Sequence, residues 1–259
     1  MTPIIIVLIL ASAALHPLRE FLIKKDSSPK GVTMAVVVQF WVYAGIEVWL
    51  RGLAPMDAFQ VWPMMVISGI GLLFYYWSVV MTLRTGDLSV YYPITRSSPL
   101  FVIVVGYLFL GHTYSVGMLA GIGLVLVAAF LLQYKRGSRF FSQPLTLTFA
   151  FLAMSGHGVI TLADAEAMKH VEPAVFVFVL YLCLVPAMAV LLTVTSPPGD
   201  DVGRIFLRGW VDTPVRYIVA GTTAYASYYL ILLAFQLGAN VAALSAIRQI
   251  SIPFSVLLG

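Results

Sequence analysis

The stretch QVWPMMVISGIGLLFYYWSVVMTL, residues 60–83, contains no charged side chain and shows no alternation of apolar and polar positions. About 20 consecutive apolar residues are enough for a helix to cross the hydrocarbon core of a bilayer. The strands of a membrane barrel would instead alternate with a period of two. The stretch therefore predicts a membrane-spanning helix.

The rest of the chain has a similar composition. Of its 259 residues, 61% are hydrophobic and 10% are charged, with a mean hydropathy of +0.96. Soluble domains are about 45–50% apolar and about 25% charged, which excludes a soluble enzyme. Nine apolar runs follow one another, with approximate bounds 3–23, 32–50, 60–83, 90–111, 114–134, 145–163, 172–194, 214–236 and 239–259. We expect an all-α polytopic protein of a lipid bilayer. Segment 195–213 is the only loop long enough to fold on the membrane surface, and we favour a plain connector there.

Basic residues gather in the loops between the runs. The odd-numbered loops carry Lys24, Lys25, Lys30, Arg84, Lys135, Arg136, Arg139, Arg204, Arg208 and Arg216, whereas the even-numbered loops carry Arg51 and Lys169. The positive-inside rule then places the odd loops in the cytoplasm and the N-terminus outside. The net charge of +4 thus indicates basic loops beside a membrane rather than a nucleic-acid surface. The single cysteine, Cys183, forms no disulfide framework.

The chain also carries an internal repeat at a separation of about 152 residues. The matching pairs are Gly69 and Gly221, Tyr76 and Tyr228, Gly86 and Gly238, and Arg96 and Arg248. Because five runs precede the second half, that half starts from the opposite membrane face, as in the inverted repeats of secondary transporters. We expect two inverted five-helix repeats, 1–137 and 138–259, in a ten-helix fold of which nine helices are present. The equivalent of 107–134 would follow Gly259: either the chain continues there, which we favour, or that helix has been lost.

Two segments resemble a known family. Residues 82–102, TLRTGDLSVYYPITRSSPLFV, with LFLG at 108–111, are similar to the end of an EamA domain of the drug/metabolite transporter superfamily. Residues 14–25, ALHPLREFLIKK, resemble the opening of that domain, most closely in a subgroup associated with phosphonate utilisation. The resemblance implies two inverted five-helix halves, a central substrate cavity, export of small metabolites and cytoplasmic termini. The last point conflicts with the loop charges, and His112 replaces an acidic residue usual in the family.

The repeated arginines are the leading candidates for substrate binding. An arginine inside a span costs about 2.5–3.5 kcal/mol on insertion scales, so Arg96 and Arg248 each need a ligand or a protein partner. Nearby prolines break helices and expose carbonyl groups that a watery cavity can satisfy. The substrate-binding set is Arg96, Arg248, Tyr92, Tyr76, Tyr228 and Ser251, with Pro99 and Pro253 as helix breaks. The alternative is structural: each arginine pairs with a carboxylate or carbonyl, and Arg96 extends towards the surface.

Three residues are candidates for proton coupling. Glu47 is an intramembrane carboxylate, and His16 and His157 fall in corresponding early helices of the two halves. The alternative for Glu47 is an ion pair with Arg51 one turn later, and for the histidines it is helix packing. The histidines and the cysteine have no metal-ligand spacing, so no metal or cofactor is expected.

The sequence as a whole predicts a secondary transporter that works by alternating access. Two guanidiniums favour a small polar solute with an anionic or zwitterionic character, such as an amino acid or phosphonate. Export from a bacterial inner membrane is what the family resemblance implies. The alternatives are a multidrug or organic-cation exporter of the same superfamily and a non-transporting membrane partner. Motifs of metalloproteases, serine hydrolases and Walker-type nucleotide binding are missing from the sequence, so we do not expect an enzyme. A monomer could suffice, and a homodimer is the open alternative.

Overall fold

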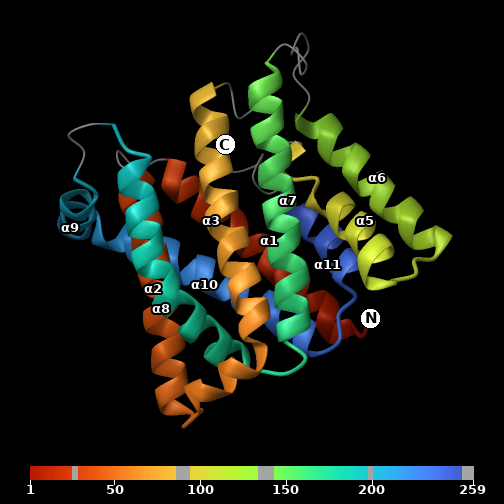
Figure 1. Cartoon of the computed structure of the whole chain (residues 1–259), viewed down its shortest axis with the longest axis horizontal. Helices are drawn as coiled ribbons and strands as arrows, with labels where there is room; N and C mark the ends of the chain where they lie inside the picture. The colour runs from red at the N-terminus through yellow and green to blue at the C-terminus, as the bar shows by residue number, and fades with distance from the viewer. Residues whose placement is uncertain (25–28, 86–93, 134–142, 198–200, 253–259) are drawn as a thin grey trace.

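The computed structural model describes residues 1–24, 29–85, 94–133, 143–197 and 201–252. Within these ranges the chain is all-helical, with ten α-helices, two 3-10 helices and no strand. The elements are α1 (Pro3–Lys24), α2 (Pro29–Leu50), η1 (Pro55–Val61), α3 (Trp62–Thr85), α5 (Ser98–Leu110), α6 (Val116–Gln133), α7 (Pro144–Ala167), α8 (Pro173–Val194), α9 (Val202–Asp212), α10 (Pro214–Gln236), α11 (Val241–Ile247) and η2 (Arg248–Ile250). The expected all-α class is therefore confirmed (Figure 1).

Five helices are long and apolar enough to cross a membrane, as in a multi-pass membrane protein. The candidate spans are Lys30–Leu50, Pro55–Thr82, Pro144–Ala167, Pro173–Val194 and Pro214–Gln236. Shorter apolar helices cover Pro3–Leu18, Ser98–Leu110, Val116–Ala128 and Val241–Ile250. Large apolar side chains also point outward: Trp49, Leu124 and Val190 are 79%, 72% and 63% exposed. Water does not favour so apolar an outer surface.

The connector expected at 195–213 is wrong, because the segment carries helix α9. Asp201 caps this helix by accepting a hydrogen bond from the backbone N–H of Arg204 at 3.0 Å. One side of α9 packs beneath Tyr217 of α10, whose ring lies where a Cβ on Gly209 would be. The helix is too short and too polar overall to produce an apolar run, yet Val202, Phe206 and Trp210, one turn apart, pack with the main hydrophobic core.

The described part of the apolar run expected at 90–111 does not form one continuous helix. Arg96 lies in a turn, and α5 begins at Ser98 with Pro99 in its first turn. At that position a proline costs little, because the N–H it lacks has no partner within the helix. The helix break expected at Pro99 thus lies just before this residue, in the turn that contains Arg96.

Three helix pairs make the most extensive contacts: α3 with α7, α1 with α10, and α2 with α8. In Figure 1, α3 and α7 run side by side across the front of the bundle. Their close approach depends on glycine, because a Cβ on Gly156 would lie 3.2 Å from the carbonyl oxygen of Gly71. Between α1 and α10, the hydroxyls of Ser12 and Ser227 each donate to the other's backbone carbonyl, at 2.7 and 2.9 Å.

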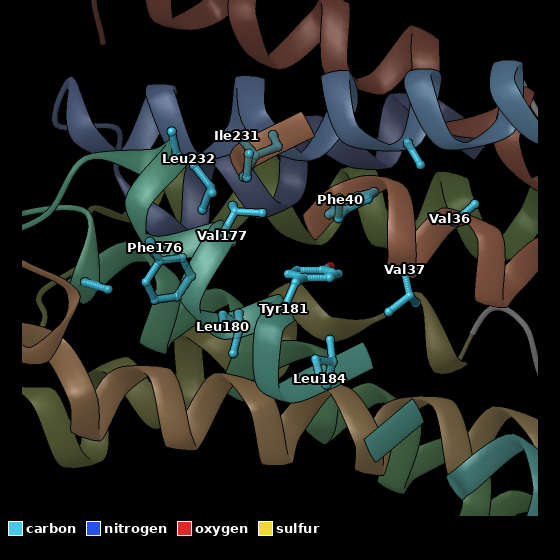
Figure 2. Packing of buried hydrophobic residues seen from close by; sticks show 14 of the residues in the cluster. Val36, Val37, Phe40, Phe176, Val177, Leu180, Tyr181, Leu184, Ile231 and Leu232 are labelled. Atoms are coloured by element: carbon cyan, nitrogen blue, oxygen red, sulfur yellow. The ribbon is translucent and has the colours of Figure 1, made fainter. Parts of the chain in front are cut away.

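The main hydrophobic core joins α2, α8 and α10. Phe40 of α2 stacks on Tyr181 of α8 with ring centroids 4.7 Å apart. Figure 2 shows Leu180 and Leu184 of α8 near Tyr181, and Ile231 of α10 on the other side of the two rings. This core fixes the three helices that form one wall of the cavity described next.

Candidate functional site

A cavity of about 100 Å³ lies between helices from both parts of the chain. Its walls come from α1, α2, α3, α5, α7, α8, α10, α11 and η2. The polar side chains that line it are His16, Tyr75, Tyr76, Thr95, Arg96, Ser98, His157, Thr161, Asp164, Tyr181, Tyr228, Ser245, Arg248 and Gln249. So many polar groups inside an apolar helical bundle indicate a place where a polar solute or water is held.

Six of the residues selected from the sequence meet at this cavity. They are Arg96, Arg248, Tyr76, Tyr228, His16 and His157. Neither arginine stands in regular α-helix: Arg96 lies in the turn before α5, and Arg248 begins the 3-10 segment η2 that follows α11. Irregular backbone of this kind is tolerated within membrane proteins where it borders a cavity.

Asp164 of α7 is the one carboxylate among the described residues that line the cavity. It is 2% exposed; its Oδ1 accepts a hydrogen bond from the Ser68 hydroxyl at 2.6 Å and its Oδ2 one from the Tyr228 hydroxyl at 2.7 Å. Ser68 belongs to α3 and Tyr228 to α10, so the carboxylate connects three helices. Arg248 lines the same cavity, and its positive charge acts on Asp164 and on Tyr228.

A second group of polar contacts lies in the lining of the same cavity, at the start of α5. His157 of α7 shares a hydrogen bond of 3.0 Å with the hydroxyl of Ser98, at the start of α5. The His157 ring also lies edge-on to Tyr75 of α3, with centroids 5.6 Å apart. These contacts orient the imidazole at the cavity wall, where it can donate or accept a proton depending on its tautomer.

Other predicted residues lie away from the cavity or outside the described ranges. Ser251 is fully buried beside η2 and Pro99 is buried in α5, and neither lines the cavity. Tyr92 and Pro253 belong to segments that the structure does not describe, so their predicted roles stay predictions.

Glu47 also lies away from the cavity. One carboxylate oxygen accepts from Arg51 at 2.8 Å and from the Tyr229 hydroxyl, and the other accepts from Tyr225 at 3.4 Å. Arg51 also binds Glu172 at 3.2 Å. The hydrogen bond to Glu47 raises the pKa of Arg51, which keeps the guanidinium charged. This is the ion pair that the sequence offered as the alternative role for Glu47.

The sequence analysis did not select Asp164, Ser98 or Thr161 for the site. A signal for Asp164 was present, because His157, Ile160, Thr161 and Asp164 follow the helical spacing i, i+3, i+4, i+7 and all line the cavity. Ser68 gave no comparable signal, since isolated serines are common in apolar helices.

The chemistry of the cavity is that of a polar binding site with excess positive charge. Two guanidiniums stand against one carboxylate among the described lining residues, with hydroxyls and imidazoles between them. Guanidiniums bind carboxylate and phosphate groups through paired hydrogen bonds, and a carboxylate binds ammonium. Among the described residues, no group of three or more His, Cys, Asp or Glu is placed to hold a metal ion.

Comparison with known proteins gives a likeness in fold and no family. No family model and no curated protein matches the chain. A solved structure described only as "Crystal structure of protein" is similar over 99% of this chain and 86% of its own, with a TM-score of 0.74 and 17% sequence identity. At this identity the likeness shows the shared fold alone.

Proposed function

We propose that the protein is a membrane-embedded secondary transporter that carries a compact, anionic or zwitterionic solute by alternating access. The observation that carries the proposal is the cavity, where Arg96, Arg248 and Asp164 meet inside an apolar helical bundle. Membrane embedding is supported by the five long apolar helices and by the apolar side chains on their outer faces. No nucleotide-binding motif is present in the sequence, so an ion or solute gradient would supply the energy.

The packing of the helices supports two inverted repeats, 1–137 and 138–259. Under this division α1 corresponds to α7, α2 to α8, α3 to α10 and α5 to α11. A two-fold axis would exchange the pair α3–α7 with α1–α10 and the pair α3–α8 with α2–α10, and it would map α2–α8 and α5–α11 onto themselves. All of these pairs are in contact. The cavity lies at the junction of the two halves, where one half could rock against the other.

The size and charge of the cavity support a small solute with an anionic group. Drug-sized ligands occupy pockets of about 300–1,000 Å³, and this cavity measures about 100 Å³. The excess of guanidinium over carboxylate favours a carboxylate, phosphate or phosphonate on the solute. Assignment to the EamA-type drug/metabolite transporters, export as the direction, and a bacterial inner membrane as the location are part of this proposal and rest on the sequence resemblance.

Ligand-dependent stabilisation of the purified protein in lipid nanodiscs tests the proposal. Glycine, aminomethylphosphonate, succinate and tetraethylammonium would be compared as probes of amino acids, aminophosphonates, organic acids and organic cations. A solute present at about 100 times its Kd should add about 2.7 kcal/mol to the free energy of unfolding. We expect an anionic or zwitterionic probe to stabilise the wild type and to lose that effect in Arg96→Gln and Arg248→Gln.

The matched control is Arg51→Gln, which removes an arginine that lies outside the cavity. This variant should keep the full stabilisation by solute. Stabilisation by tetraethylammonium alone, unchanged in folded Arg96→Gln and Arg248→Gln, would overturn the anionic assignment and favour an organic-cation exporter. Uptake of the stabilising probe into vesicles then separates a transporter from a binding partner.

A further inference from the structure

We infer that Asp164 is a proton-binding site whose charge controls the junction of α3, α7 and α10 at the cavity. The link from this junction to solute movement rests on the proposed function, whereas the proton site itself does not. Asp164 was not among the residues predicted from the sequence for this role, which were Glu47, His16 and His157.

The geometry gives the charge of Asp164 a structural consequence. Both carboxylate oxygens accept hydrogen bonds, from Ser68 of α3 at 2.6 Å and from Tyr228 of α10 at 2.7 Å. Both donors are neutral hydroxyls, and the Ser68 residue is 1% exposed. Hydrogen bonds to an ionised acceptor are about twice as strong as those between neutral groups. The negative charge therefore strengthens the contacts that bind α7 to both of its neighbours.

Protonation removes this reinforcement. One carboxylate oxygen takes a proton from a hydronium ion that reaches the cavity: a new carboxyl O–H bond forms, one O–H bond of the hydronium breaks to leave water, and the carboxylate becomes a neutral carboxylic acid. The new O–H is a donor and cannot accept the bond it replaces in the same way. Both contacts then lose the strength that the negative charge gave them, and the contact to the protonated oxygen is weakened further, which loosens α3 or α10 from α7.

The neighbouring charges connect this proton site to the solute site. The positive charge of Arg248 acts on Asp164. The other charged or titratable side chains at the cavity are Arg96, His16, His157, Tyr75, Tyr76, Tyr181 and Tyr228. Later on α7, Glu166 is ion-paired with Lys169. The ammonium group of a zwitterionic solute would compete with the proton for Asp164, and such competition is the condition for exchanging one for the other across a membrane.

Infrared difference spectroscopy tests the proton site without any solute. Spectra of the intact protein in lipid nanodiscs would be recorded as the pH is lowered and then restored. We expect a reversible carbonyl band of a protonated carboxyl group in the wild type. The control Glu47→Gln should keep this band, because Glu47 lies away from the cavity and is paired with Arg51 in the wild type. The band should be lost in Asp164→Asn and should move to a different frequency in Asp164→Glu. A band that is unchanged in both Asp164 variants would overturn the inference.

Hydrogen exchange tests the junction. The intrinsic pH dependence of amide exchange is first subtracted. The backbone amides of α3 and α10 should then exchange faster at low pH than at high pH, both in the wild type and in Glu47→Gln. In Asp164→Asn the same amides should exchange fast at every pH, because the asparagine side chain cannot carry the negative charge of the carboxylate. Exchange that is independent of pH in the wild type would overturn the junction. Both readouts are free of solute, so their failure is distinct from a failure of the solute-binding test of the proposed function.

Discussion

Two carboxylates accept hydrogen bonds from neighbouring tyrosines of α10, and they lie in opposite environments. Tyr228 donates to Asp164, which is 2% exposed. Tyr229 donates to Glu47, whose side chain is 25% exposed. Consecutive residues of an α-helix point about 100° apart, so α10 presents one tyrosine to the cavity and the next to the surface of α2.

The difference lies in what balances each negative charge. Glu47 has Arg51 one turn later on its own helix, and Arg51 in turn binds Glu172. Asp164 is bound by two hydroxyls, and the positive charge that acts on it belongs to Arg248, which lines the same cavity. The charge of Glu47 is balanced by a neighbour on its own helix. The charge of Asp164 lies among the groups that line the cavity, and under the proposed function a solute or proton would reach the same groups.

The largest expected effect separates the two carboxylates in transport. Asp164→Asn should lower solute flux driven by a pH gradient about 100-fold, equivalent to about 2.7 kcal/mol, because the amide cannot bind and release a proton. Glu47→Gln should leave that flux within about threefold of the wild type, since its carboxylate lies outside the cavity. The measurement is accumulation of the stabilising probe in vesicles under an imposed pH gradient.

Exchange without a gradient provides the internal control for this prediction. Asp164→Asn should still exchange labelled for unlabelled probe across the vesicle membrane, because solute binding by the arginines is retained. Equal accumulation by the two carboxylate variants would remove the functional distinction between Asp164 and Glu47.

A smaller effect is expected from the two tyrosines. Tyr228→Phe removes one of the two donors to Asp164 and leaves a buried oxygen without its partner, which costs about 1–3 kcal/mol of unfolding free energy. Tyr229→Phe leaves Glu47 bound to Arg51 and Tyr225 near the surface, and we expect a change within about 0.5 kcal/mol. Unfolding of both variants in the same detergent measures the difference. A larger loss for Tyr229→Phe would reverse the comparison.

The fold class was predictable because it depends on local properties. Runs long enough to cross a bilayer identified the positions of the long helices, and the i, i+4 spacing of Glu47 and Arg51 predicted their ion pair. Helix α9 was missed because a helix that is apolar on one side only produces no apolar run. The helix break near Pro99 was expected from the proline, but the sequence pattern does not show that the break leaves Arg96 in a turn.

The centre of the site was less predictable because it depends on how helices rotate against one another. The arginines were found because charge inside a span is rare, and the repeat marked both. Asp164 lies close to the end of its run, where an acidic residue is unremarkable. Its importance arises from Ser68 and Tyr228, which are 96 and 64 positions away in the sequence. No spacing rule brings three helices to a common point.

The smallest expected effect concerns Arg51 and tests whether Glu47 and Arg51 behave as an exposed ion pair. The Arg51 side chain is 44% exposed, and such ion pairs contribute about 0.2–1 kcal/mol. Arg51→Gln should therefore lower the unfolding free energy by less than about 1 kcal/mol, and raising the salt from about 0.1 to about 1 M should shrink the difference between variant and wild type. A loss above about 2 kcal/mol that salt leaves unchanged would mean that Glu47 is shielded from water. Glu47 would then depend on its partner as a buried carboxylate does, and exposure would no longer distinguish it from Asp164.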